Sequence, residues 1–341
     1  MARLQVQDKG DDEMEELRHL IIRFVGICVL IVFGHSFAFA QSGFPERYIR
    51  VIVPLSPGGG ADLSLVPFKD RVAKALGQPL VVSYMPGAAG AIGTALVAKA
   101  KPDGYTLLLA NKGGLISAPL TKKDVGYTMA DFTPVCLLTR SPSIFYVRDD
   151  SPYESLLDFI KIAKTKKLNY ATYGVLSLSH LATKLLEKHA GFEAIHIPYA
   201  GAGEVNVALL GGHVDMAVAT SAVKLVGAGK LRAVAVSADK RWELYPNVPT
   251  LKELGFPVAK GDPFGAMYSL WAPKGTPKEN VDRIYRAFKK VLDEHGREIS
   301  KGLDNAELNL DFLGPDEFAE VANDEYGLVK RMLEEMGVRP Q

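Results

Sequence analysis

Two glycine-rich segments carry the residues whose types and spacing are best suited to bind an anion. The first is the stretch Pro54-Leu-Ser-Pro-Gly-Gly-Gly-Ala-Asp62, which follows a β-branched run and precedes a helical pattern. Glycine lets the backbone turn sharply and expose successive N–H groups, and the start of a helix adds partial positive charge. We therefore expect an anion-binding loop here. Asp62 stands where a helix N-cap belongs, so it either caps the helix or orients the loop or its ligand.

The second segment is Met85-Pro-Gly-Ala-Ala-Gly-Ala-Ile-Gly93, which also connects a predicted strand to a predicted helix. A nucleotide site is not indicated. The first loop is followed by Leu63 and Ser64 instead of the Lys-Ser/Thr of a P-loop, and the second lacks the dinucleotide spacing. A tight packing turn is the alternative for the second loop. Loops after consecutive strands meet at the carboxyl edge of an α/β sheet, so together the two would offer backbone donors to a carboxylate.

Polar residues follow the predicted strands of the second half of the chain. Ser177 and Ser179 could donate to a ligand; alternatively, Ser179 caps the next helix and His180 packs in its first turn. Tyr199 either closes over a ligand or fills an interface between lobes. Ser221 follows a further strand and is predicted to face the same edge.

Catalytic and metal-binding motifs are missing from the sequence. It contains no G-x-S-x-G elbow, no H-E-x-x-H and no Cys/His cluster. Cys136 is predicted to be buried in a strand, and Cys28 lies in the N-terminal segment, so no internal disulfide is expected. We predict no catalytic residue, no metal and no cofactor. The histidines beyond residue 40 are predicted to be isolated: His180, His189, His196, His213 and His295.

Alternating strand and helix patterns must position these loops, which predicts an α/β fold. The expected strands are 49–54, 80–84, 106–110, 144–147, 168–172, 195–198, 216–219, 233–237 and 266–272. The expected helices are 62–76, 91–101, 152–165, 179–190, 278–295 and 315–336.

A chain of 341 residues is long enough for two lobes. We predict that 44–146 and 256–341 form lobe 1, with the C-terminal helices returning to cover it, and that 147–255 form lobe 2. Hydrophobic residues make up 48% and charged residues 23% of the sequence, as in an ordinary globular protein, and the formal net charge of +1 gives no basis for nucleic-acid binding. A monomer is expected.

Residues 1–40 have the layout of a secretory signal peptide. Arg18 and Arg23 precede an apolar run at 24–33, and Ala38-Phe-Ala40 forms a small-x-small cleavage pattern before Gln41. A transmembrane anchor is the alternative, but the run is about half the roughly 20 residues that a bilayer span needs. We predict export and cleavage near Ala40. Translation from Met14 would remove the acidic stretch that is unusual in such a peptide.

Taken in order, the motifs of the chain resemble those of the tripartite tricarboxylate transporter receptors, also called the Bug family of extracytoplasmic solute receptors. The resemblance is carried by Tyr48-Ile-Arg-Val-Ile-Val-Pro, Pro57-Gly-Gly-Gly-Ala-Asp62, Pro86-Gly-Ala-Ala-Gly-Ala-Ile-Gly93, Lys101-Pro-Asp-Gly-Tyr-Thr-Leu-Leu-Leu109, Ser179-His-Leu-Ala182, Ile197-Pro-Tyr199, Leu210-Gly-Gly-His-Val-Asp215, Gly229-Lys-Leu-Arg-Ala-Val-Ala-Val236 and Asn247-Val-Pro-Thr250. It implies a two-lobed periplasmic-binding-protein fold of type II, with a mixed, helix-flanked sheet in each lobe. It also implies a periplasmic location, a small carboxylate ligand and a membrane permease as partner.

The resemblance further implies which residues bind the ligand. Family members hold a ligand carboxylate through backbone groups of the two glycine-rich loops, and their second lobe contacts the distal end of the ligand. Carried over, the contacts in the first lobe are Ser56, Gly58, Gly59, Asp62, Ala88, Ala89 and Ala91, and those in the second are Ser177, Tyr199, Ala202 and Ser221.

The chain departs from the family pattern mainly near the distal end. Pro-Gly-Ala-Ala-Gly stands where Pro-Gly-Ala-Gly-Gly is common, and Leu55 replaces an aromatic residue. The stretch from Gly174 to Ser177 carries Val and Leu where the family is glycine-rich. The added apolar bulk favours a ligand with an apolar or aromatic body and one carboxylate. A sensory receptor and a secreted hydrolase using Ser177 or Ser179 with His180 are the competing functions.

Overall fold

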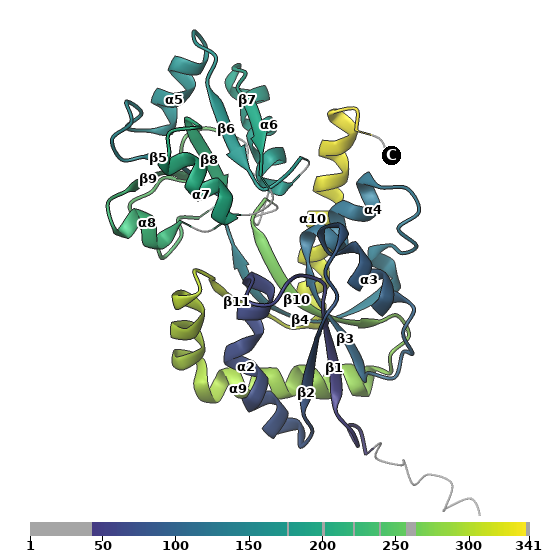
Figure 1. Ribbon diagram of the computed structural model, residues 1–341. Coiled ribbons are helices and arrows are strands. Elements are labelled where there is room, and N and C mark those ends of the chain that lie inside the picture. The colour runs from purple at the N-terminus through teal and green to yellow at the C-terminus, as the bar shows by residue number, and fades with distance from the viewer. Residues whose placement is uncertain are drawn as a thin grey trace, which may run out of the picture. The chain divides into compact units, whose positions relative to one another are not determined.

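The computed structural model describes residues 43–175, 177–199, 202–220, 222–238, 240–256 and 264–338 (Figure 1). The predicted signal peptide at 1–40 and the predicted ligand residue Ser221 lie outside these ranges. Within them, no helix combines the length and the apolar character that a membrane span requires. The described chain alternates strands with helices and builds two mixed β-sheets, so the predicted α/β class is confirmed.

The first sheet has six strands in the order β11-β4-β10-β3-β1-β2. β1 pairs in parallel with β2 and with β3, whereas β10 runs antiparallel to β3 and β4. β1 is β-branched at every position except Arg50, and all its residues except Arg50 are buried, as expected of a strand covered on both faces. The strands are β1 (Ile49–Val53), β2 (Leu80–Tyr84), β3 (Thr106–Asn111), β4 (Phe132–Ser141), β10 (Ala266–Pro273) and β11 (Leu310–Leu313).

Helices from both ends of the described chain pack on this sheet. α2 and α9 lie side by side (Figure 1), with the rings of Phe68 and Phe288 5.7 Å apart. α10 packs on β4, and its Phe318 meets the edge of Trp271 at 4.9 Å. The helical segments are α2 (Gly60–Leu76), η2 (Ala88–Gly90), α3 (Ala91–Ala98), η3 (Gly113–Ser117), α4 (Ala118–Thr121), η4 (Met129–Asp131), α9 (Lys278–Asn305) and α10 (Pro315–Glu335).

The second sheet has five strands in the order β7-β6-β8-β5-β9. β6 pairs in parallel with β7 and β8, whereas β5 is antiparallel to β8 and β9. The strands are β5 (Ile144–Arg148), β6 (Asn169–Thr172), β7 (Ile195–Pro198), β8 (Met216–Ala219) and β9 (Leu231–Val236). The helices that accompany them are α5 (Leu156–Ala163), α6 (Leu178–Ala190), α7 (Ala202–Leu210) and α8 (Val223–Gly227).

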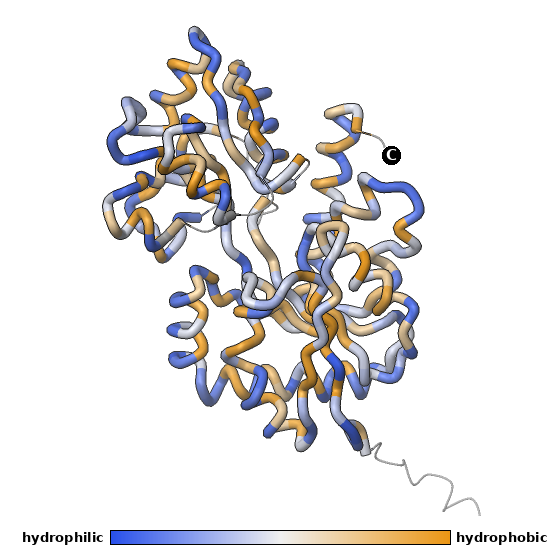
Figure 2. Tube along the Cα trace, viewed as in Figure 1, coloured by the Kyte–Doolittle hydropathy of each residue, from blue (hydrophilic) through white to orange (hydrophobic). Residues whose placement is uncertain are grey.

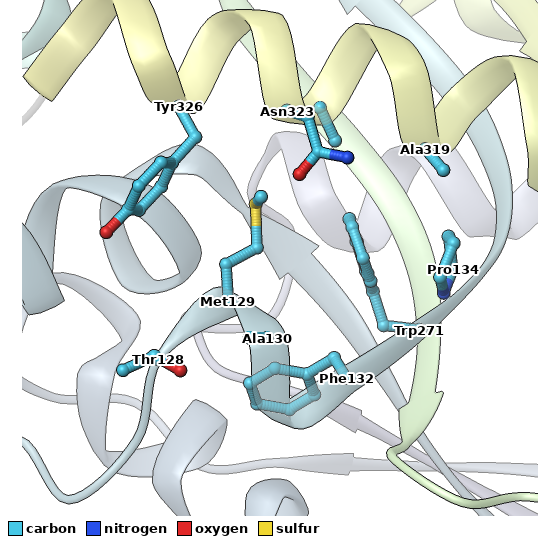
Figure 3. Close-up of a pocket in the computed structure, with 10 residues that line it drawn as sticks. Thr128, Met129, Ala130, Phe132, Pro134, Trp271, Ala319, Asn323 and Tyr326 are labelled. Atoms are coloured by element: carbon cyan, nitrogen blue, oxygen red, sulfur yellow. The ribbon is translucent and has the colours of Figure 1, made fainter.

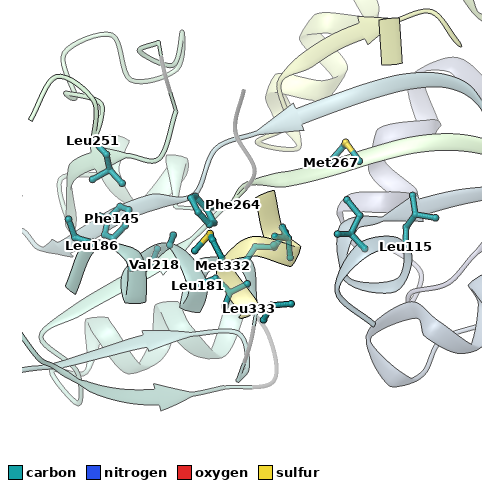
Figure 4. Close-up of a cluster of buried hydrophobic side chains, with 14 of the residues drawn as sticks. Leu115, Phe145, Leu181, Leu186, Val218, Leu251, Phe264, Met267, Met332 and Leu333 are labelled. Carbon is teal, nitrogen blue, oxygen red and sulfur yellow. The ribbon is translucent and has the colours of Figure 1, made fainter. Parts of the chain in front are cut away.

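Hydrophobic residues concentrate in the strands of the six-stranded sheet (Figure 2). One buried cluster takes in Phe145 and Val218 of the second sheet, Met267 of the first sheet and Leu115 of η3 (Figure 4). Burial of these side chains is the main source of stability, at roughly 25 cal/mol per Å² of apolar surface. Apolar packing therefore stabilises the fold, and the groups that could bind a ligand lie in the loops at the strand ends.

Cys136 is fully buried in β4, as the sequence predicts, and it is a free thiol. Burial raises its pKa well above the ordinary value, so it carries no reactive thiolate at neutral pH. Its role is packing.

Candidate ligand-binding site

The first glycine-rich loop connects β1 to α2. Ser56 and Gly58 are exposed, and Gly58 adopts the left-handed conformation at φ +76°. Gly59 is the N-cap of α2 and has no side chain with which to cap the helix. The first N–H groups of a helix have no partner inside it. Here they are left for an acceptor outside the helix, and the helix dipole favours an anion.

Asp62 is not the N-cap that the sequence predicts, because the helix begins earlier, at Gly60. Its carboxylate instead accepts the backbone N–H of Gly58 at 2.9 Å and the hydroxyl of Tyr84 at 2.7 Å. The hydrogen bond from Tyr84 to Asp62 raises the pKa of Tyr84. Asp62 thus ties the loop to β2, which corresponds to the second of its two anticipated roles, orienting the loop.

The second loop, between β2 and α3, has an unusual backbone. Ala88 and Ala89 both lie in the left-handed region, at φ +49° and +59°, between Gly87 at +133° and Gly90 at +101°. Left-handed conformations cost a non-glycine residue about 1 kcal/mol or more, and such strain gathers at functional sites. Both alanines are exposed, whereas Ala91 is buried and its N–H donates to the carbonyl of Ala88. The N–H groups of Gly90 and Ala91 are thus engaged inside the loop, at the carbonyls of Gly87 and Ala88.

Asn111, the last residue of β3, supports the second loop. Its Nδ2 donates to the carbonyl of Ala89 at 3.2 Å, and a Cβ on Gly90 would lie 2.5 Å from its Oδ1. Lys122 donates from Nζ to the carbonyl of Ala88 at 3.4 Å. Neither Asn111 nor Lys122 is among the ligand-site residues predicted from the sequence. The only available signal for Asn111 was its place at the end of a predicted strand.

The strand order brings the two loops to one edge of the sheet. β1 is flanked by β2 and β3, and all three run parallel. Their carboxyl ends therefore share an edge, where ligands bind in open α/β sheets. The edge presents glycine and alanine backbone, with the carboxylate of Asp62 already occupied.

The second sheet has a corresponding edge, at the carboxyl ends of β7, β6 and β8, which are also parallel. Ser177 is the N-cap of α6: its hydroxyl accepts the N–H of His180 at 3.2 Å and donates to Thr172 at 3.3 Å. The alternative that made Ser179 the cap is wrong. Ser179 is fully buried in the helix, with its hydroxyl 3.1 Å from that of Ser143.

The other predicted contacts follow β7 and β8. The N–H of Tyr199 donates to the carbonyl of Thr172 at 2.9 Å, and its half-buried ring packs against the core of the second sheet. Ala202 is the first residue of α7. Thr220, next to the undescribed Ser221, follows β8. Residues of three loops thus share this edge.

Two of the histidines that the sequence analysis treated as isolated are stacked on each other. The rings of His180 and His196 are 3.9 Å apart and nearly parallel, at 10°. His196 also stacks on Tyr170 and shares a hydrogen bond of 2.8 Å with Thr172. Burial, the neighbouring His196 and Lys184 lower the pKa of His180 to about 4, and burial and Lys184 lower that of His196. Both rings are therefore neutral at pH 7.

A hollow of about 450 Å³ lies elsewhere, between the start of β4, β10 and α10 (Figure 3). Its walls include the aromatic side chains of Phe132, Trp271 and Tyr326, which lie around Met129. It contains none of the predicted ligand residues. Among the described residues, no group of three or more Cys, His, Asp or Glu side chains could hold a metal ion.

Comparisons with known proteins point to one family. A family model described as the tripartite tricarboxylate transporter family receptor matches residues 67–338. The chain is 33% identical over 298 residues to the UPF0065 protein in the gbd 5′ region of Cupriavidus necator, covering 86% of this chain and 89% of that one. It is 32% identical over 278 residues to BugT of Bordetella pertussis, covering 80% and 84%.

Solved structures give the same result. A TctC solute-binding protein from Polaromonas is 31% identical, with a TM-score of 0.72 over 86% of this chain and 99% of that chain. MatC from Rhodopseudomonas palustris, solved with bound malate, is 30% identical, with a TM-score of 0.71 over 85% and 100%. Another Rhodopseudomonas palustris protein, solved with adipate, is 26% identical, with a TM-score of 0.75 over 87% and 100%.

Proposed function

Because the chain belongs to the tripartite tricarboxylate transporter family of receptors, we propose that it binds a small organic carboxylate in the periplasm and delivers it to a membrane permease of that system. The observation that carries the proposal is the shared edge of β1, β2 and β3. There, two loops offer backbone N–H groups and a helix N-terminus to one anion.

Within this proposal the first lobe holds the carboxylate and the second holds the body of the ligand. Ser56, Gly58, Gly59, Ala88 and Ala89 contact the carboxylate, Ala91 lines the site, and Asp62 fixes the first loop. The body of the ligand meets Ser177, Tyr199, Ala202 and Ser221. We take lobe 1 as 44–146 with 256–341, lobe 2 as 147–255, and the mature chain as beginning near Gln41 after removal of residues 1–40.

The class of ligand is supported by relatives and by the sequence. The two Rhodopseudomonas palustris proteins hold malate and adipate, which share carboxylates and differ in their chains. This chain adds Val175, which is 66% exposed, to the loop after β6. An exposed apolar side chain beside Ser177 favours a ligand whose body is apolar.

Catalysis is not part of the proposal. The fold and the family are those of solute-binding receptors, which are not enzymes. The hydroxyl of Ser177 is engaged in capping α6, and that of Ser179 faces Ser143, so neither is paired with the ring of His180.

The test begins with native mass spectrometry of the mature chain, followed by denaturing extraction to identify any acid that co-purifies. The same preparation is then titrated by calorimetry with adipate, malate, citrate and benzoate, using adipamide and benzamide as neutral controls. Saturable binding of at least one acid and of neither amide is expected. A chain that carries no acid and binds none of the four would contradict the proposal.

A further inference from the structure

Tyr268 of β10 places its phenol ring against the start of α2. A Cβ added to Gly60, the first residue of that helix, would collide with the Tyr268 hydroxyl and lie 2.8 Å from both Cε2 and Cζ of the ring. Only a glycine fits there with the tyrosine in place. The hydroxyl consequently lies beside the first N–H groups of α2, where the proposed function seats a carboxylate.

The strand register links Tyr268 to the second loop as well. In the antiparallel pair of β10 and β3, Tyr268 stands directly opposite Asn111. Opposed residues in such a pair project from the same face of the sheet. Asn111 holds the carbonyl of Ala89 and lies against Gly90. One cross-strand pair therefore supports both glycine-rich loops, Tyr268 the first and Asn111 the second.

The hydroxyl of Tyr268 is suited to donate to an anion. Burial and the neighbouring phenol of Tyr173 raise the pKa of Tyr268, so the proton stays on the oxygen throughout the ordinary pH range. An ionised carboxylate only accepts hydrogen bonds, whereas a phenol can donate one. The donor and the expected ligand group are thus complementary.

We propose that Tyr268 binds the ligand directly, its hydroxyl donating a hydrogen bond to the carboxylate held at the start of α2. The inference rests on the proposed function and adds one side-chain donor to a site otherwise made of backbone. Since Gly60 and Asn111 fix the ring, the hydroxyl is held in place before the ligand arrives, which lowers the entropic cost of binding.

The experiment replaces the hydroxyl and keeps the ring, with Tyr268→Phe. The chain offers a matched control in Tyr285 of α9, whose hydroxyl also lies against a glycine at a helix start. A Cβ on Gly314, the N-cap of α10, would be 2.9 Å from it. The wild type, Tyr268→Phe and Tyr285→Phe are each titrated by calorimetry with adipate, malate, citrate and benzoate, and unfolded in urea.

Hydrogen bonds to charged groups are strong enough that losing one should weaken binding about 10-fold or more. We expect that loss for Tyr268→Phe with every acid that the wild type binds, unchanged affinity for Tyr285→Phe, and wild-type urea midpoints for both. Equal affinity of Tyr268→Phe and the wild type, or an equal loss in both variants, would overturn the inference and leave the proposed function standing. A wild type that binds none of the four acids would instead remove the proposed function and this inference with it.

Discussion

Each of the two sheets brings the ends of three parallel strands to one edge. The two edges differ in whether backbone or side-chain groups are available to a ligand. At the edge of β2, β1 and β3 the loops are rich in glycine and alanine, with Ala88 and Ala89 in left-handed conformations. At the edge of β7, β6 and β8 the polar groups are side chains, namely the hydroxyls of Thr172 and Ser177 and the imidazole of His196. A backbone cradle recognises a carboxylate whatever is attached to it, whereas side chains can distinguish the attached body. The proposed function therefore assigns affinity for the acid group to the first edge and selectivity to the second.

If the first edge depends on its backbone, Gly90→Ala should be the most damaging single change there. Gly90 has φ +101°, which side-chain-bearing residues avoid, and the new Cβ would lie 2.5 Å from Oδ1 of Asn111. We expect a loss of about 2–3 kcal/mol in the free energy of unfolding. Affinity for every acid should fall by at least about 10-fold, since the donors of the second loop move. Urea denaturation and calorimetry measure the two effects.

Gly77→Ala is the matched control for that change. Gly77 is the C-cap of α2 at φ +75°, with nothing within 4 Å of an added Cβ. It should lose about 1 kcal/mol of stability from the same kind of strain and keep its affinity. If both variants lose affinity in proportion to stability, the backbone of the second loop has no special part in binding.

Asp62→Ala should have the next largest effect, because it frees the first loop from β2. The variant loses the hydrogen bonds from Gly58 and Tyr84. We expect roughly 10-fold weaker binding of any acid, with a stability loss of about 1 kcal/mol. Tyr84→Phe, which removes only one of the two hydrogen bonds, should lie between the wild type and Asp62→Ala in calorimetric titrations. Loss of stability with full affinity would assign Asp62 a structural role only.

The sequence predicted the strand ends better than the contacts made at them. The strands at 80–84, 195–198 and 216–219 coincide with β2, β7 and β8, because each is a short β-branched or apolar run between breakers. The helix starts are less accurate: α2 begins at Gly60 with Gly59 as its cap, so of the two roles open to Asp62 the cap is wrong, and Ser177 supplies the cap for which Ser179 is the sequence alternative. Several residues near these starts are competent caps, and a pattern of types cannot choose among them.

Local sequence patterns could not predict the contacts between segments that are distant in the chain. His180 and His196 belong to different elements, and only the parallel pairing of β6 with β7 brings Thr172, His196 and the start of α6 together. The same holds for Asn111 and Tyr268, whose register depends on a strand that returns from the far end of the chain. Such pairings are set by tertiary packing, which local propensity does not encode.

Acidification should affect the second edge selectively, through the stacked imidazoles. The folded state lowers the pKa of His180 to about 4 and also lowers that of His196, so the unfolded chain binds protons more tightly. Stability is therefore complete above about pH 6.5 and falls as the pH drops from there towards 4, by about 1.4 kcal/mol per pH unit for each proton. Lys184 and Glu187, which are ion-paired at 2.6 Å, and the phenol of Tyr170 are the other titratable groups around the pair.

The test compares urea unfolding at pH 7 and pH 5 for the wild type, His180→Gln and the surface control His213→Gln. The pH dependence should shrink in His180→Gln and persist in His213→Gln. An unchanged dependence in His180→Gln would mean that the stacked pair is not its source.

The smallest effect is expected from Ala89→Gly, which tests whether the first edge carries strain. Ala89 has φ +59°, which glycine adopts without penalty, so the substitution should relieve about 1 kcal/mol. The gain is partly offset by the greater freedom of glycine in the unfolded chain, which leaves a net stabilisation of a few tenths of a kcal/mol. The backbone donors are retained, so affinity for any acid should stay within about 2-fold of the wild type. Ala95→Gly, within the ordinary helix α3, should instead destabilise by about 1 kcal/mol, and opposite signs for the two alanines in urea unfolding would place the strain in the second loop.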